Sequence, residues 1–327
     1  MDRKSIGGNQ LICMQKLYRI GTRESQLAVW QATRVQEGLA QHGISAELVY
    51  IKSEGDLDLQ TPLYEMGVQG VFTRSLDAAL LDHRIDIAVH SMKDVPTQLP
   101  RGLEQAAVLE RGPVHDLLVY KNDLNFLSLK EYSASIATSS IRRKAQWLHK
   151  YPAHQIHNLR GNVNTRLKKL DTEDWDAAIF AQAGLERIQL RPEKSILLDW
   201  MLPAPAQGAI MIVCREGDDE ALEACEPLND SNTAFCTKIE REFLRALLGG
   251  CSTPISALAE IEDGDVYFRG QILSLDGRQK VEVERILPIE KADYIGTEAA
   301  EELLANGGRE IADSISHASK KSTEQQQ

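Results

Sequence analysis

Apolar positions in the first third of the chain switch between strand-like and helix-like spacing. Helical spacing follows Ser25, a residue type that often caps helices, and continues to about His42. The remaining segments of this series are predicted as strands at 17–22, 46–51 and 85–89 and as a helix at 72–83.

The same alternation returns in the middle of the chain. The predicted strands are 116–120, 135–137, 156–159 and 177–181, and the predicted helices are 141–150 and 163–170. Strands that alternate with helices form parallel or mixed sheets with helices on both faces. The first two-thirds of the chain is therefore predicted to be α/β.

The pattern changes after Asp230, which is a candidate cap for a helix that runs to Leu248. Three segments of alternating polarity follow at 255–261, 266–273 and 280–287, and a final helix is predicted at 297–316. Asp276-Gly277 is typical of a hairpin turn between the last two strands. This part is predicted to be a separate α+β module, and Pro203-Ala204-Pro205 is predicted to mark a crossing between domains.

Composition argues against several classes of partner. The chain has 327 residues, a formal net charge of −11 and 6% aromatic residues, which disfavours binding to nucleic acid or to an anionic membrane. It has no apolar run of membrane-helix length and no apolar stretch typical of a signal peptide. Its five cysteines form no CxxC pair, which argues against a disulfide framework or a structural zinc site. We expect a cytoplasmic protein without a metal.

Three strand-to-helix junctions place hydroxyl or amide caps beside arginines. A helix N-terminus is already positive, so arginines there indicate a bound carboxylate or phosphate. In open α/β sheets such junctions lie where ligands bind. Surface positions or internal ion pairs are the alternative for each arginine. The three junctions are Thr22–Ser25, Thr138–Lys144 and Leu159–Arg166.

Two further segments carry chemistry. Lys93 and Asp94 follow a predicted buried strand, where Lys93 could pair with an anion and Asp94 could act on a cation or an N–H group; alternatively, Asp94 stabilises the turn before Pro96. Gly249-Gly250-Cys251 presents a thiol on a flexible turn, which favours a reactive cysteine, with a buried structural cysteine as the alternative.

Together these motifs resemble the hydroxymethylbilane synthase (porphobilinogen deaminase) family. The resemblance covers the chain from about Leu17 to the final helix, with the motifs in the family's order. The matching stretches are Ile20–Arg23, Leu27–Ala32, Asp86–Pro96, Thr138–Arg143, Leu159–Leu167, Pro205–Gly208 and Gly249–Ile255.

The resemblance implies three domains. Two α/β domains, similar to periplasmic binding proteins, flank a cleft, and a small α+β domain carries a dipyrromethane cofactor on Cys251 through a thioether. The expected bounds are 17–110 with 204–226, then 114–202, then 230–318, with 1–16 and 319–327 as flexible tails. The family condenses four porphobilinogen molecules head to tail, releases ammonia, and then frees hydroxymethylbilane for tetrapyrrole synthesis. The resemblance also implies that the protein is a monomer.

The resemblance further implies the roles of individual residues. Asp94 matches the catalytic carboxylate, which would hold pyrrole N–H groups and stabilise the azafulvene cation. The matching positions for the carboxylates of cofactor and substrate are Arg23, Ser25, Lys93, Thr138, Ser139, Ser140, Arg142, Arg143, Arg160, Gly161, Asn162, Arg166, Arg187 and Gln207.

The chain departs from the family's pattern at Glu54, Gln69, Leu248 and Ser256. Gln69 replaces a frequent lysine, so a lysine contact there is not carried over. Two other classes of protein are the alternatives. A noncatalytic carboxylate-binding module would need neither Asp94 nor a modified Cys251, and a cysteine hydrolase would need a histidine base that the local sequence does not supply.

Overall fold

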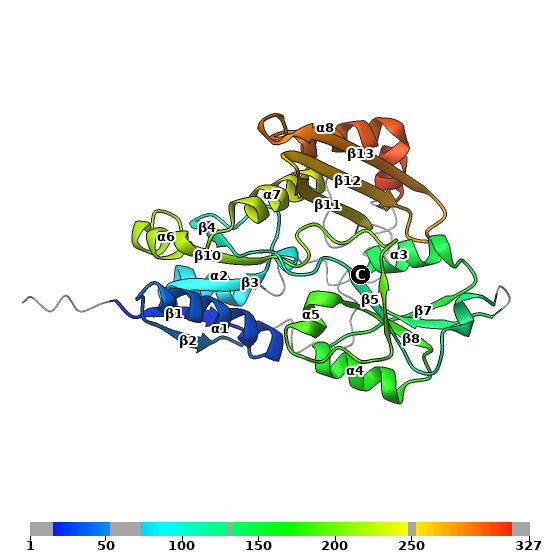
Figure 1. Ribbon diagram of the computed structural model, residues 1–327, viewed down its shortest axis with the longest axis horizontal. Helices are drawn as coiled ribbons and strands as arrows, with labels where there is room; N and C mark the ends of the chain where they lie inside the picture. Colours follow the sequence, from blue (N-terminus) through cyan, green and yellow to red (C-terminus); the bar gives the residue numbers. More distant parts are fainter. Residues whose placement is uncertain (1–15, 53–72, 130–131, 248–252, 316–327) are drawn as a thin grey trace, which may run out of the picture.

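The computed structural model describes residues 16–52, 73–129, 132–247 and 253–315, which form three sheets with their helices (Figure 1). The first sheet has the order β2-β1-β3-β10-β4. Strands β1–β3 are parallel, whereas β10 is antiparallel to both of its neighbours. Its strands are β1 (Tyr18–Thr22), β2 (Ala46–Tyr50), β3 (Ile87–Ser91), β4 (Leu103–Val108) and β10 (Ile210–Arg215).

Helices cover both faces of this first sheet. Alternate residues of β3 pack on opposite sides, Ile87 and Val89 in one core and Ala88 in the other. Because both faces are buried, the strand reads as a continuous apolar run rather than an alternating one. The helices that accompany the sheet are α1 (Gln26–Gln41), α2 (Arg74–Leu81) and α6 (Asp219–Cys225).

The second sheet repeats this plan. Its order is β7-β6-β8-β5-β9, and β5 is the strand that runs antiparallel to its neighbours. The strands are β5 (Asp116–Tyr120), β6 (Ser135–Ala137), β7 (Gln155–His157), β8 (Ala177–Ala181) and β9 (Ser195–Leu198). The helices are α3 (Ile141–Lys150), α4 (Val163–Thr172) and α5 (Gln182–Glu186). The expected α/β class is confirmed, in its mixed rather than its all-parallel form.

The third sheet is an antiparallel meander, β11 (Ile255–Glu262), β12 (Asp265–Leu273) and β13 (Lys280–Pro288). Helices α7 (Ser231–Ala246) and α8 (Ile295–Leu303) share one core with it. The predicted α+β module is confirmed, and Asp230 caps α7 by accepting from the Thr233 amide at 2.7 Å. The continuous final helix predicted for 297–316 is wrong, because the chain leaves helical geometry at Gly307 (φ +103°).

Two connecting segments join the first sheet to the second, one after β4 and one after β9. They meet where the Gly112 amide donates to the Gly208 carbonyl at 3.1 Å. Arg111 pairs with the fully buried Glu240 of α7 at 2.6 Å, and Glu240 also accepts from the amide of Ala259 on β11. The junction of the sheets is thus tied to the third module by buried polar contacts.

The third module also contacts the second sheet through α3. The turn between β12 and β13 packs on this helix, and the Gly277 carbonyl lies 2.7 Å from Nδ1 of His149. Of the four positions that depart from the family's pattern, Ser256 lies within the described residues. Its side chain is buried, and its hydroxyl accepts a hydrogen bond from Gln146 of α3 at 3.0 Å. Its hydroxyl therefore adds a bond that glycine or alanine could not make.

Candidate active site

Three helices begin with the caps that the sequence predicted. Ser25 accepts from the amide of Ala28 at 3.4 Å, Ser140 from that of Arg143 at 3.4 Å, and Asn162 from that of Thr165 at 2.9 Å. The first turns of α1, α3 and α4 contain no acidic residue. Each helix therefore directs an uncompensated positive end toward its strand-to-helix junction.

These helix starts converge although they belong to two different sheets. Asn164 at the start of α4 donates to Gln26 at the start of α1 at 3.0 Å. Arg166 lies within electrostatic range of Arg143, Arg160 and Asp94. Burial, together with repulsion from Arg143 and Arg160, lowers the pKa of Arg166 to about 10, so it stays charged at neutral pH.

Lys93 and Asp94 lie on a short 3-10 turn (Met92–Asp94) at the end of β3. Lys93 donates to Oε1 of Gln207 at 3.3 Å. Burial and the nearby Arg143 lower the pKa of Lys93 to about 8, although Asp94 acts in the opposite direction. The turn thus presents a cation and a carboxylate side by side, facing the arginines of the second sheet.

Asp116 is a charged member of this cluster that the sequence did not single out. Its carboxylate accepts from Arg142 at 2.7 Å, from Arg143 at 2.7 Å and from Gln207 at 3.0 Å, and it is fully buried. Burial alone would raise its pKa, but the two arginines outweigh burial and hold the pKa well below its usual range. The sequence did carry a signal for this residue, namely an aspartate at the first position of the otherwise apolar strand β5.

The two arginines that hold Asp116 still have unused donors. Nε of Arg142 and Nε of Arg143 are buried and have no hydrogen-bond partner among the described residues. A buried donor without a partner costs free energy unless a ligand accepts from it. Internal ion pairs, the alternative for these arginines, are therefore present, but they leave donors that suit additional carboxylates.

Other predicted residues shape the junctions. Gly161 has φ +111°, and a Cβ atom there would lie 2.7 Å from Thr165, so the turn requires glycine. Nε of Arg166 donates to the Gly161 carbonyl at 2.7 Å. Ser139 donates to the Leu159 carbonyl, and Thr138 accepts from the amide of Ser140. These contacts connect the second junction to the third.

Three further predicted residues, Arg160, Arg187 and Gln207, are buried or half-buried. Arg187 donates to the Gly208 carbonyl at 2.5 Å and lies over the ring of Trp30. Gln207 is buried and bridges Lys93 to Asp116. Arg160 is 2% exposed. In this structure Arg187 and Gln207 both form hydrogen bonds with protein groups.

The proposed attachment cysteine, Cys251, lies outside the described residues, as do Glu54, Gln69 and Leu248. The three cysteines that the structure describes, Cys214, Cys225 and Cys236, are buried. Burial raises the pKa of each thiol, to about 11 for Cys214 and about 12 for Cys225 and Cys236. Thiols of this kind are poor nucleophiles at neutral pH.

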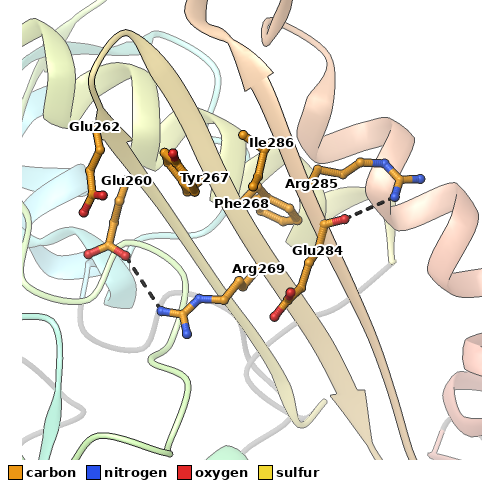
Figure 2. Close-up of a pocket in the computed structure, with 8 residues that line it drawn as sticks. All are labelled: Glu260, Glu262, Tyr267, Phe268, Arg269, Glu284, Arg285 and Ile286. Carbon is orange, nitrogen blue, oxygen red and sulfur yellow. Dashed lines mark hydrogen bonds and ion pairs between the residues drawn. The ribbon is translucent and has the colours of Figure 1, made fainter.

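A cavity of about 490 Å³ lies away from these residues, on the outer face of β11–β13 (Figure 2). Glu260, Glu262 and Glu284 line it, and Glu260 pairs with Arg269 at 3.8 Å. These three carboxylates outnumber the two arginines of the lining, Arg269 and Arg285, so the cavity does not favour a ligand that itself carries carboxylates. This cavity is therefore not the counterpart of the cationic cluster.

Comparison with known proteins decides the family. The family model described as "Porphobilinogen deaminase, dipyromethane cofactor binding domain" matches residues 18–223, and the model of the C-terminal domain matches residues 234–305. This chain belongs to the porphobilinogen deaminase family. A porphobilinogen deaminase of Syntrophotalea carbinolica is 43% identical over 90% of this chain and 94% of its own length. One of Chlorobium phaeobacteroides is 42% identical over 91% and 97%.

The solved structures that match share less with this chain. The methionine binding protein MetQ is 14% identical, with a TM-score of 0.41 over 67% of this chain and 92% of its own. The VFT2 domain of Bordetella pertussis BvgS is 12% identical, with a TM-score of 0.38 over 65% and 86%. The porphobilinogen deaminase family is instead recognised at the level of sequence over most of the chain.

The residues of this chain fit the family's dipyrromethane cofactor. Pyrroles that carry acetate and propionate groups need several cationic partners, and buried guanidinium donors are available on Arg142 and Arg143. The described residues contain no cluster of three or more potential metal ligands. No helix in the described ranges is long and apolar enough to cross a membrane.

Proposed function

We propose that this chain condenses porphobilinogen units head to tail on a dipyrromethane attached to Cys251, as the family's transferase, hydroxymethylbilane synthase, does. One observation carries the proposal. Lys93 and Arg166 both lie within electrostatic range of Asp94. Arg143 lies within range of both cations and of Asp116, and Arg160 lies within range of Arg166. The bound dipyrromethane supplies a permanent primer to which pyrrole units are added.

The basic residues of the cluster bind carboxylates. Each porphobilinogen carries an acetate and a propionate, so four additions bring many negative charges to one place. Lys93 and Arg166 are buried enough for their pKa values to fall to about 8 and about 10. Binding an anion relieves this cost, and guanidinium groups can hold a carboxylate with two parallel hydrogen bonds.

The helix starts add a second source of positive potential. The N-termini of α1, α3 and α4 lack acidic residues in their first turns, so free amide groups and the helix dipoles remain available to carboxylates. Helices α1 and α4, which belong to different sheets, meet at the Asn164–Gln26 contact. In this proposal a chain of linked pyrroles lies between the two sheets and is held from both sides.

Asp94 acts on the reacting part of the substrate. The bond between carbon and nitrogen in the protonated aminomethyl group breaks, and neutral ammonia leaves with the bonding electrons, so the positive charge passes to the substrate pyrrole. A carboxylate fixed beside that ring stabilises the charge and accepts hydrogen bonds from pyrrole N–H groups. Lys93 and Arg166 lie near enough to Asp94 to interact with it electrostatically.

Asp116 has a structural part in the same cluster. It neutralises Arg142 and Arg143 from the side of the protein core, at 2.7 Å each. Without this counter-ion, two adjacent buried guanidinium groups would repel each other. The arginines are therefore held in fixed positions before any ligand arrives, which lowers the cost of ordering them on binding.

The attachment site is tested by mass spectrometry of the intact protein, followed by peptide mapping. We expect an added mass of two linked pyrroles on the Cys251 peptide. Cys251→Ser should yield a folded protein without the adduct. The matched control, Cys13→Ser, changes the other cysteine outside the described residues and should keep the adduct. An adduct retained by Cys251→Ser would overturn the assignment.

The reaction is tested by incubating the loaded protein with porphobilinogen and measuring ammonia and the protein's mass. A synthase releases ammonia and gains mass in steps of one pyrrole unit. A noncatalytic carboxylate-binding module would bind porphobilinogen and release no ammonia. The absence of ammonia from a protein that carries the adduct would refute the proposed activity.

We also propose that the chain works as a monomer in a reducing compartment. Three free buried cysteines support the reducing compartment, since oxidised proteins rarely keep such thiols unpaired. Light scattering during size-exclusion chromatography tests the oligomeric state: a mass near 36.4 kDa supports a monomer, and twice that mass contradicts it.

A further inference from the structure

Arg241 makes an unusual set of contacts. It lies on α7, yet its guanidinium donates to the carbonyls of Val95 at 2.9 Å and of Pro96 at 2.6 Å, with a weaker contact to the carbonyl of Met92 at 3.4 Å. All three carbonyls belong to the segment that displays Lys93 and Asp94 at the end of β3. One side chain of the third module therefore spans the whole turn.

These bonds are not a by-product of an ion pair. Within the described ranges, no carboxylate lies within ion-pair distance of Arg241. Burial lowers its pKa to about 10, so the group is charged at neutral pH although it is half-buried. A half-buried cation whose two terminal nitrogens donate to carbonyls of one turn stabilises that turn in one geometry.

The turn itself is held by few other bonds. The Val95 amide donates to the Met92 carbonyl at 3.1 Å, which closes the 3-10 turn, and the Met92 amide donates to the Ala209 carbonyl at 3.0 Å. Short 3-10 turns have poorer hydrogen-bond geometry than α-helices. The guanidinium of Arg241 is therefore a major support for the backbone that carries Asp94.

Arg241 lies on the helix that precedes the segment with Cys251. Helix α7 ends at Ala246, and the segment with Cys251 follows it in the chain. Arg241 thus connects the helix that leads to the proposed attachment site with the turn that carries the proposed catalytic carboxylate. Helix α7 belongs to the third module, whereas the turn follows β3 of the first sheet. No local sequence rule relates these two elements.

We propose that Arg241 is a positioning residue, which fixes the Lys93–Asp94 turn relative to the helix that precedes Cys251. This inference rests on the proposed function for its catalytic consequence. Its structural part does not depend on the reaction. Only a guanidinium offers donors in a planar fork wide enough for several carbonyls, so lysine is an incomplete substitute.

The structural part is tested by hydrogen–deuterium exchange of the peptide covering residues 90–98. In Arg241→Gln we expect exchange of this peptide to be at least ~5-fold faster, because the turn opens more often. Arg241→Lys should be intermediate. Arg245→Gln, an exposed arginine one turn along the same helix, should match the wild type. Exchange within ~2-fold of the wild type in a folded Arg241→Gln protein would overturn the proposal.

The catalytic part is tested by single-turnover release of ammonia. Misplacing a catalytic group by about 1 Å costs up to ~100-fold in rate, so we expect Arg241→Gln to lower the rate ~10- to 100-fold and to change KM less than ~3-fold. In an Asp94→Asn background the same substitution should cost less than ~3-fold, since the group it positions has already been lost. Equal losses in both backgrounds would show that Arg241 does not act through Asp94 and would overturn its positioning role.

The two measurements separate the inference from the proposed function. If the wild-type protein released no ammonia, the proposed function would fail, and the exchange of residues 90–98 would still decide whether Arg241 holds the turn. If ammonia were released and Arg241→Gln had normal exchange and a normal rate, the proposed function would stand and the positioning role would be refuted.

Discussion

The substitution Asp116→Asn tests how the cationic cluster is held together. The change keeps the shape of the side chain and removes one negative charge. It leaves Arg142 and Arg143, whose side chains are each 6% exposed, without their counter-ion. It also turns one acceptor into an amide that would face a guanidinium donor or Gln207.

The expected magnitude follows from the burial of the partners. Removing one member of a buried ion pair typically costs about 3–5 kcal/mol, because an uncompensated charge stays in the interior. Asp116 serves two arginines, so we expect a loss near the upper end of that range. Exposed Asp199 in the same part of the chain is the matched control, and Asp199→Asn should change stability by less than about 0.5 kcal/mol.

The pH dependence of this loss gives a second check. The pKa of Asp116 is lowered in the folded state, from an ordinary value of about 3.9. Its contribution is therefore fully present above pH ~4 and is lost as the pH falls through the folded pKa. The difference in stability between wild type and Asp116→Asn should be constant near neutral pH and shrink in acid.

Urea unfolding followed by tryptophan fluorescence is a suitable assay. Trp147, Trp175 and Trp200 pack in the cores on either side of the second sheet, to which Asp116 belongs. A fall in the unfolding midpoint for Asp116→Asn, with no shift for Asp199→Asn, is the expected result. Equal midpoints for the two variants at pH 7 would refute the idea that Asp116 holds the arginine pair.

Three further predictions concern the site and its surroundings. Asp94→Asn should lower kcat for ammonia release by about 10²- to 10³-fold and leave the unfolding midpoint unchanged; a loss below about 3-fold would contradict a catalytic role. The wild-type kcat/KM should fall as pH rises above about 8, where Lys93 loses its charge. In Lys93→Arg this fall should move to higher pH, and an unmoved limb would assign it to another group. Gly277→Ala should lower the thermal midpoint by the equivalent of about 1–3 kcal/mol, because its Cβ would lie 2.5 Å from the Ala145 carbonyl of α3. Gly264→Ala, with a similar φ of +87° and nothing within 4 Å, is the control and should cost less.

Much of the fold was within reach of the sequence because its signals are local. Capping residues act over three or four positions, and the caps at Ser25, Ser140, Asn162 and Asp230 were each assigned or implied by residue type. Apolar spacing likewise placed the parallel strands to within a few residues. The final helix was predicted as continuous, because its break at Gly307 depends on a positive φ that spacing alone does not indicate.

The strand order needed more than the pattern of single segments. Strands β4, β9 and β10 were not assigned individually, and β10 enters the first sheet after the chain has completed the second. An antiparallel strand buried on both faces has the same apolar composition as a parallel one. Its partner and direction are decided by where the chain returns, which no local window contains.

The sequence by itself determined the family, the helix starts with their arginines, and Asp94 and Cys251 as the residues on which the proposed chemistry rests. Only the tertiary structure decided which charges meet. Asp116 pairs with arginines of α3, and Arg241 reaches the turn beside Asp94, across long separations in the chain. The physical reason is that capping and periodicity act over a few residues. Burial and ion pairing depend instead on distances in space, which exist only once the sheets and the third module have packed together.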